Sequence, residues 1–151
     1  MKKQSLFWIL LIVLLVGASR VLAQDVQDGL AGKLRERHPD AVIQYAIEER
    51  DDGKMEWNVF FTTGTQFGMC EMDSRTLMLR DVKTYDLPAG ALTADKAIEA
   101  LVAQKGELTL LSLELEYDDG RLLYQGEADW KGQRFEFEMT VDGRLVEWER
   151  D

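Results

Sequence analysis

Hydrophobic and polar residues alternate with a period of two over several stretches of this chain, and shorter stretches between them have the period of a helix. The i, i+3, i+4, i+7, i+8 spacing of an amphipathic helix is met by Ala94, Ala97, Ile98, Leu101 and Val102. Thr93 suits the N-cap of this helix, Lys105 suits its carboxyl end, and Gly106 is typical of a stop. The pattern therefore predicts a helix that begins after Thr93 and ends near Gly106.

Strand-like alternation follows this helix to the end of the chain. Leu111, Leu113 and Leu115 alternate with polar residues, and the same alternation returns in 121–130, 133–141 and 144–148. Three short turns join these stretches, at Asp119-Gly120, Lys131-Gly132 and Asp142-Gly143. Asp-Gly between alternating stretches is a strong hairpin signal, because both turn positions favour positive φ. A sheet of four antiparallel strands is therefore expected, with one face buried and the other exposed to solvent.

The first half of the chain repeats this layout less regularly. Val26, Leu30 and Leu34 form a helical stripe that stops at His38-Pro39, since the residue before a proline is pushed out of the helical region. Alternating stretches follow around 43–47, 55–61, 66–72 and 77–82. A shift of 67 residues places 51–54 on 118–121 and 71–72 on 138–139, with Asp-Asp-Gly and Glu-Met conserved between the copies.

The expected fold class is α+β, in two tandem units that each consist of one helix packed on a four-stranded antiparallel meander sheet. The first unit spans residues 24–84 and the second spans residues 93–151. The segment 85–92 contains Pro88 and Gly90 and is interpreted as the linker between them.

Residues 1–23 have the composition of a secretory signal peptide. Lys2 and Lys3 precede an uncharged apolar run over 6–18, and small residues occupy the positions before a cleavage site after Ala23. The run is too short for a retained membrane helix. We therefore expect a periplasmic or secreted protein with no stable membrane anchor after cleavage.

The chain is acidic, with 28 Asp and Glu against 18 Lys and Arg in 151 residues. Removing residues 1–23 takes away three basic and no acidic residues, which leaves a net charge of −13. Nucleic acid is therefore a poor partner, and electrostatics favour a basic one. Cys70 is the only cysteine, so no internal disulfide can form, and no motif calls for a cofactor.

The second unit resembles a PepSY domain, a small module found in metalloprotease propeptides and in many short exported bacterial proteins. The motifs that carry the resemblance cover about residues 93 to 151; the first unit is a weaker match over 25–83. These motifs are 94–98 opening the helix, Gly106, 113–116, Asp119-Gly120, Tyr124, Lys131-Gly132, and 135–139 running into 142–146.

Two departures from the family pattern concern turns. The family commonly has Asp-x-x-Thr-Gly before its last strand, whereas this chain has Leu77 after 73–76 and a shortened Asp142-Gly143 turn in the second unit. The paired layout is also similar, in architecture alone, to secreted protein inhibitors of β-lactamase. The resemblance implies a non-catalytic module that binds, and in some cases inhibits, an extracytoplasmic protein or peptidase.

The sequence contains few residues that could form a catalytic or metal-binding site. His38 and Cys70 are the only imidazole and thiol outside the signal peptide, and no local signature pairs them, so we expect a buried Cys70 and no enzyme activity. The chain has too few His and Cys residues for a zinc site. Asp51-Asp52 and Asp118-Asp119 are explained by the turns beside them, with weak calcium binding as the alternative.

Two further sets of residues leave alternatives open. The carboxylates of Glu114, Glu116, Glu136 and Glu138 fit a solvated sheet face, or an acidic recognition surface. Phe60 is out of phase with its apolar neighbours, while Trp130 and Trp148 lie at strand ends, so these three aromatic residues are the candidate binding residues.

The leading functional hypothesis is an exported, non-catalytic binding module for an extracytoplasmic protein, with restraint of an enzyme as one form of it. The alternative is a sensor-like accessory protein of the cell envelope that binds a small ligand or a cation through its acidic turns. No metal site and no cofactor site is assigned from the sequence.

Overall fold

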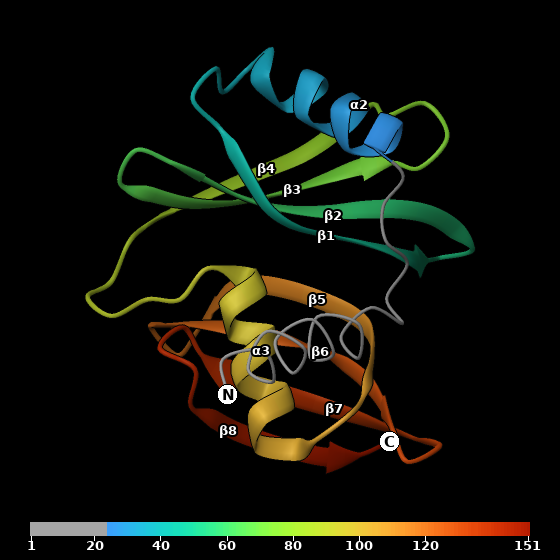
Figure 1. The fold of residues 1–151 in the computed structure, drawn as a ribbon, viewed down its shortest axis with the longest axis vertical. Coiled ribbons are helices and arrows are strands. Elements are labelled where there is room, and N and C mark those ends of the chain that lie inside the picture. Colours follow the sequence, from blue (N-terminus) through green and yellow to red (C-terminus); the bar gives the residue numbers. More distant parts are fainter. Residues whose placement is uncertain (1–23) are drawn as a thin grey trace, which may run out of the picture.

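The computed structural model describes residues 24–151, so the predicted signal peptide lies outside the described residues. It confirms the α+β class and the two helix-plus-sheet layouts (Figure 1). The first comprises α2 (Gln24–Arg35), β1 (Val42–Asp51), β2 (Lys54–Thr63), β3 (Gln66–Asp73) and β4 (Leu79–Asp86). The second comprises α3 (Ala94–Lys105), β5 (Thr109–Asp118), β6 (Arg121–Trp130), β7 (Gln133–Thr140) and β8 (Leu145–Arg150).

Each sheet is an antiparallel meander in chain order, β1-β2-β3-β4 in the first sheet and β5-β6-β7-β8 in the second. The sequence encodes three of the tight turns directly. Asp52-Gly53, Asp119-Gly120 and Lys131-Gly132 all have positive φ at both positions, which matches the right-handed twist of the strands that they join. The predicted hairpins at Asp119-Gly120 and Lys131-Gly132 are therefore confirmed, and so is the turn beside Asp51-Asp52.

The fourth strand of the first sheet extends further than its sequence pattern predicts. Alternation indicates a strand over 77–82, whereas β4 runs to Asp86, with Tyr85 paired to Phe67 and Thr84 paired to Gly68. Leu77 precedes the strand in a left-handed conformation, with φ of 55°. Tyr85, near the end of the strand, packs against the second unit, a contact that a local pattern does not reveal.

The helix α2 covers one face of the first sheet (Figure 1). Leu30 and Leu34 are fully buried there, as their helical spacing predicts, against the inward side chains of β2 and β3. This first core contains Leu30, Leu34, Ala41, Trp57, Val59, Phe61, Cys70 and Met72.

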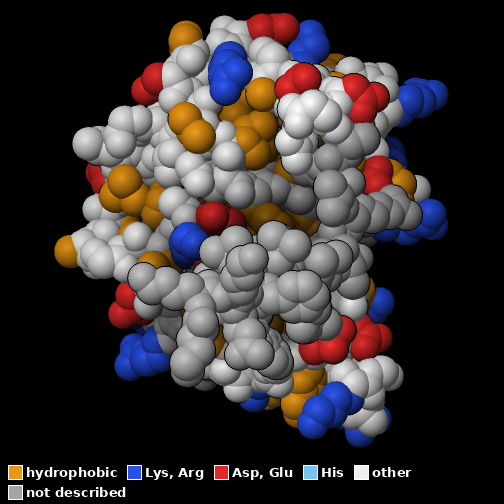
Figure 2. All heavy atoms as spheres, viewed as in Figure 1, with side chains coloured by type: hydrophobic (Ala, Val, Ile, Leu, Met, Phe, Trp, Pro, Cys, Tyr) orange, Lys and Arg blue, Asp and Glu red, His pale blue; other side chains and the backbone are white. Residues whose placement is uncertain are grey.

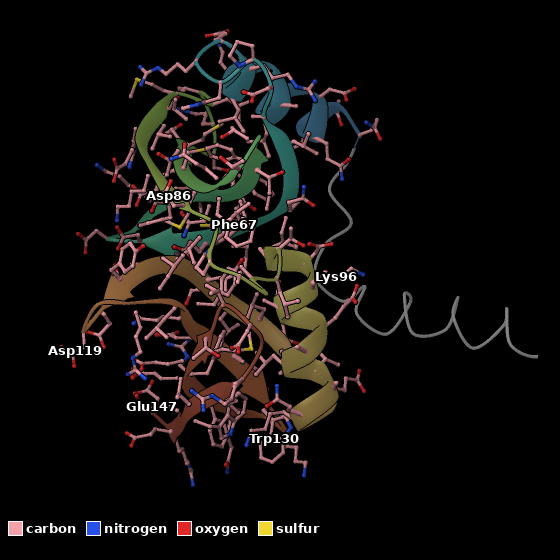
Figure 3. The ribbon with its side chains drawn as sticks, turned by 90° about the vertical axis from the view of Figure 1, so that its left-hand side faces the viewer. Phe67, Asp86, Lys96, Asp119, Trp130 and Glu147 are labelled. Carbon is pink, nitrogen blue, oxygen red and sulfur yellow. The ribbon has the colours of Figure 1, made fainter. Side chains whose placement is uncertain are left out.

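The second core is shared between the two units. The opposite face of the first sheet contributes Phe60, Phe67 and Met69 to the same cluster as α3 and the inward face of the second sheet. Figure 3 shows Phe67 at the boundary between the units. The first sheet is therefore covered on both faces, by α2 on one and by the second unit on the other.

The second sheet is covered by α3 on one face. The helix begins after Thr93, whose backbone is extended as an N-cap requires, and ends at Gly106, whose N–H donates to the carbonyl of Val102. The Thr93 hydroxyl donates to Asp95 rather than capping a backbone N–H. Neither helix among residues 24–151 is long and apolar enough to cross a membrane.

Candidate functional site

The face of the second sheet that points away from α3 carries a dense set of carboxylates. Leu113 and Leu115 of β5 are buried towards α3, so their neighbours on the strand point to the other side. Figure 3 shows Glu147 on this side of the sheet, away from α3. We call this surface the acidic face; its Glu residues are Glu114, Glu116, Glu127, Glu136, Glu138, Glu147 and Glu149.

The carboxylates of the acidic face lie directly opposite one another across the strands. Glu138 pairs with Glu147 and Glu136 pairs with Glu149, while Glu136 also faces Glu127. Like charges in directly opposed positions destabilise a sheet. The two rows across the strands are Glu114, Gln125, Glu138, Glu147 and Ser112, Glu127, Glu136, Glu149.

Basic side chains only partly compensate these rows: burial and neighbouring carboxylates raise the pKa values of Glu138 and Glu114 by more than Arg121 lowers the first and Lys83 lowers the second. Arg134 lies 3.5 Å from Glu127, and both side chains are more than a third exposed, so this ion pair contributes little. Gln125 donates to Glu138 at 3.4 Å. Burial and then the neighbouring Glu147 raise the pKa of Glu138, which is the expected effect of two carboxylates that share one location.

The acidic face is slightly hollow. An open depression of about 310 Å³ lies over its centre. Polar oxygen and amide groups dominate its lining, which comprises Ser112, Glu114, Gln125, Gly126, Glu127, Glu136, Phe137, Glu138 and Glu147. Gly126 cannot carry a side chain, because a Cβ there would come within 2.2 Å of the Ser112 carbonyl oxygen.

The acidic face continues into the joint between the two units through Glu114. Burial has the largest effect on the pKa of Glu49 and raises it. The negative charges of Glu114 and Glu56 raise it further, so that it reaches about 7. Burial and the neighbouring Glu116 raise the pKa of Glu114 itself, against the lowering effect of Lys83.

Asn58 connects the two units inside this joint. Its amide nitrogen donates to Glu49 at 2.7 Å and to the carbonyl of Leu113 in β5 at 3.2 Å, and the residue is only 1% exposed. The hydroxyl of Tyr85 donates to the next outward carbonyl of β5, that of Leu115, at 3.0 Å. The outer edge of β5 is thus hydrogen-bonded to side chains of the first sheet.

Arg80 of the first sheet pairs with two carboxylates near this joint. Arg80 contacts Glu56 at 3.1 Å and Asp73 at 3.3 Å. Asp73 also accepts from the backbone of Arg75 and Thr76, and these hydrogen bonds lower its pKa. The Asp-x-x-Thr motif of the first unit is therefore a turn, with a geometric role.

Phe60 is not an exposed binding residue, which corrects one expectation from the sequence. It does lie on the face opposite Trp57 and Phe61, as its phase predicts, but the second unit covers that face. Phe60 is 2% exposed, and its ring lies near those of Tyr45 and Tyr124.

Trp130 and Trp148 lie together, and both are partly exposed. Figure 3 shows Trp130 where α3 ends. The indole N–H of Trp130 donates to the carbonyl of Lys105 at 2.9 Å and so caps the carboxyl end of α3. Lys105 lies over the Trp148 ring and Lys131 over the Trp130 ring, at 4.7 and 4.2 Å. The two Trp side chains therefore have a structural role at the end of α3, where lysine side chains cover their rings. Their role in binding stays a prediction.

Cys70 and His38 belong to the covered side of the first sheet. Cys70 is fully buried, and burial raises the pKa of its thiol to about 12, so the nucleophilic thiolate is absent at neutral pH. The His38 ring packs against Phe61 with 5.5 Å between the ring centroids. In the part of the chain that the structure describes, no group of three His, Cys, Asp or Glu residues could hold a metal ion.

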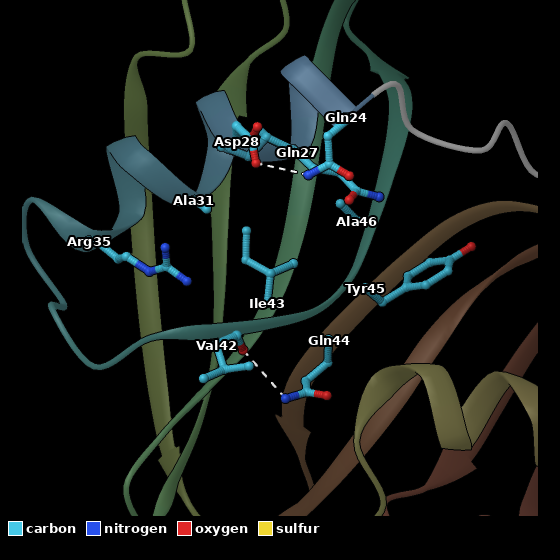
Figure 4. A pocket seen from close by; sticks show the side chains of 11 residues that line it. Gln24, Gln27, Asp28, Ala31, Arg35, Val42, Ile43, Gln44, Tyr45 and Ala46 are labelled. Carbon is cyan, nitrogen blue, oxygen red and sulfur yellow. Dashed lines mark hydrogen bonds between the residues drawn. The ribbon is translucent and has the colours of Figure 1, made fainter.

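A second depression, of about 430 Å³, lies between α2 and the edge strand β1 (Figure 4). Its lining mixes the polar side chains of Gln27, Asp28 and Arg35 with the aliphatic side chains of Leu30 and Ile43. Figure 2 shows apolar side chains around this position in the upper half of the molecule, with charged side chains along the rim. No set of titratable groups suited to catalysis converges in it.

The alternation of Glu with apolar residues in 133–141 identified part of the acidic face, but the sequence alone missed its extent. Glu127, Glu147 and Glu149 join it only because the register places them opposite Glu136 and Glu138. The joint residues Glu49 and Asn58 gave no signal, because their partners in β5 lie more than 50 residues away in the sequence.

No family model and no curated protein matches this chain. Three solved structures do. A protein of Clostridium difficile 630, described as a candidate lipoprotein, has a TM-score of 0.44 and 16% identity over 78% of this chain and 88% of its own. The YpmB protein of Bacillus subtilis has a TM-score of 0.39 and 11% identity over 85% of this chain and 100% of its own.

The third is the C-terminal domain of YpeB from Bacillus megaterium, with a TM-score of 0.34 and 13% identity over 85% of this chain and 65% of its own. All three TM-scores lie below 0.5, so the resemblance to PepSY domains rests on the sequence motifs.

Proposed function

We propose that this protein is an exported, non-catalytic module that binds a basic partner protein outside the cytoplasm through its acidic face. The observation that carries the proposal is the pair of carboxylate rows on the uncovered face of the second sheet. Directly opposed carboxylates weaken a sheet, so the fold gains nothing from them. They do provide a surface with a strong preference for Lys and Arg side chains.

Three features support the binding role over a catalytic one. The thiol is buried with a raised pKa, the Ser112 hydroxyl in the depression accepts the Glu127 backbone N–H at 3.0 Å, and Glu114, Glu136, Glu147 and Glu149 are exposed. The signal-peptide pattern of residues 1–23 supports an extracytoplasmic location. The resemblance to PepSY domains favours a peptidase or another exported protein as the partner.

The test compares two triple variants with the same change of charge. Glu136→Gln/Glu138→Gln/Glu147→Gln neutralises the acidic face, whereas Asp28→Asn/Glu36→Gln/Glu99→Gln neutralises exposed carboxylates on and beside the helices. Both are titrated with fluorescently labelled octalysine, at low and at moderate salt. We expect the first variant to bind at least ten-fold more weakly than the unmodified protein and the second to change by less than about two-fold.

An equal loss in both variants would show that only the net charge attracts the probe, and that would overturn the proposal. Circular dichroism of both variants checks that the fold is kept. The affinity of the unmodified protein is expected to fall with added salt, because exposed charges are screened over about 10 Å at 0.1 M salt.

A further inference from the structure

The two edges of the second sheet differ in what covers them. The outer edge of β5 is closed by the first sheet, since Asn58 and Tyr85 donate to its outward carbonyls. At the other edge, β8 pairs with β7 on one side and with no strand of residues 24–151 on the other. Figure 1 shows β8 on the rim of the molecule furthest from the first sheet.

The register indicates which backbone groups of β8 point outward. The N–H of Asp151 donates to the Arg134 carbonyl of β7 at 3.1 Å. Successive residues of a strand direct their N–H and C=O groups to opposite sides, and opposed residues alternate between bonded and non-bonded pairs. The backbone groups of Glu149 therefore point to β7, and those of Trp148 and Arg150 point to the open edge.

The side chains beside this edge alternate in chemistry. Glu147 and Glu149 lie on the acidic face, and both are exposed. Trp148 lies on the opposite face, partly exposed, against Phe135 and Phe137. A segment that paired with β8 would thus meet carboxylates on one face and an aromatic ring on the other.

We propose that β8 accepts an extended segment of the basic partner as a fifth, antiparallel strand of the second sheet. The segment carries Lys or Arg opposite Glu147 and Glu149, and apolar residues opposite Trp148. This inference rests on the proposed function and adds the mode of binding. Backbone pairing at a sheet edge supplies affinity, and the alternating side chains supply specificity.

The other open edges fit such a segment less well. On β4, Asp81 and Lys83 place both signs of charge along the edge, 4.0 Å apart. The strand β1 lies against β5 and α3 of the second unit, and its register shifts between Ile43 and Tyr45. The stretch of β8 from Glu147 to Arg150 is in regular register with β7 and carries acidic side chains on one face only.

Two variants of one exposed residue separate strand pairing from charge attraction. Arg150→Pro removes an outward N–H without breaking a bond to β7, because proline is tolerated at an edge where the N–H faces solvent. Arg150→Ala makes the same change of charge and keeps the N–H. We expect Arg150→Pro to bind an alternating Lys-Val dodecapeptide about five-fold more weakly than Arg150→Ala.

Modified peptides provide the second arm. In the antiparallel pairing, the residues opposite Trp148 and Arg150 exchange backbone hydrogen bonds with them, and those are the Val residues of the probe. Methylation of the Val amides should abolish most of the affinity, whereas methylation of the Lys amides should leave it within about two-fold.

Equal binding by the two Arg150 variants, together with equal binding by the two methylated peptides, would overturn the strand-pairing mode. The proposed function would survive that result if the triple variant of the acidic face still bound octalysine more weakly. If the two triple variants bound octalysine equally well, both proposals would be overturned.

Discussion

At the scale of single residues, the turns were predictable because their energetics are local. Asp52 and Asp119 occupy the left-handed region that their Asp-Gly turns require. Leu77 shows the opposite case, since it has a φ of 55° where the resembled family commonly has Gly. Its side chain packs with the first core, against α2, so packing offsets the strained backbone.

Glu49 should make the stability of the protein fall as pH rises. Its pKa of about 7 in the folded state lies above its ordinary value of 4.5, so the folded state binds more protons than the unfolded state between these values. The free energy of unfolding therefore declines from about pH 4.5 to about pH 7, and this loss is complete above pH 7. After allowance for solvent screening, we expect a loss of about 1 to 3 kcal/mol.

Denaturant unfolding of Glu49→Gln measures this effect. The variant should be more stable than the unmodified protein at pH 8 and close to it at pH 5, because Gln carries no charge beside Glu56 and Glu114. If the free energy of unfolding changed equally with pH in the two proteins between pH 5 and pH 8, the effect could not be assigned to Glu49.

Gly68 should not tolerate a side chain, although it lies in a strand where other residues are ordinarily preferred. A Cβ at this position would come within 2.2 Å of the Phe61 ring, so Gly68→Ala should lower the free energy of unfolding by about 1 to 3 kcal/mol. Gly32→Ala is the matched control. It lies in α2 with nothing within 4 Å, and it should stabilise the protein by about 0.5 to 1 kcal/mol in the same denaturant titration.

At the scale of elements, period-two alternation identified which residues share a face but not what covers that face. Trp57 and Phe60 were correctly placed on opposite faces of β2, because the pleat fixes this within the strand. That both faces are buried depends on the approach of α3 and β5, which follow β2 by more than 30 residues. The acidic face was incompletely predicted for the same reason, since the register decides which Glu residues oppose each other.

The carboxylate rows should reduce the stability of the second sheet. Glu149→Lys places a positive charge opposite Glu136 and replaces a repulsive pair with an attractive one, so it should stabilise the protein by about 0.5 to 1 kcal/mol. Glu107→Lys is the control, because it makes the same change of charge at an exposed position outside the strands. Equal shifts of the thermal midpoint in both variants would mean that net charge, not cross-strand repulsion, is responsible.

At the scale of the whole molecule, the repeat along the sequence correctly predicts two similar layouts, but the interior does not divide the same way. Phe60, Phe67 and Met69 belong by sequence to the first unit and by packing to the core of the second. The sequence similarity between the halves predicts that they share a layout. It does not predict which face of the first sheet packs against the second unit.

Because of the shared core, the two sheets should lose structure together. Phe60→Ala removes a 2% exposed ring from the boundary and should lower the free energy of unfolding by about 3 to 5 kcal/mol. Hydrogen exchange read separately in β2 and β7 should show faster exchange in both strands, since both depend on the same cluster.

Val42→Ala is the control for this experiment, because Val42 is 53% exposed on the edge strand β1 and its truncation should leave both strands protected. If Phe60→Ala accelerated exchange in β2 and left β7 unchanged, the second unit would be independently stable. The acidic face would then stand on a separate domain. If both strands respond, the two units unfold as one cooperative structure, and the acidic face belongs to that structure.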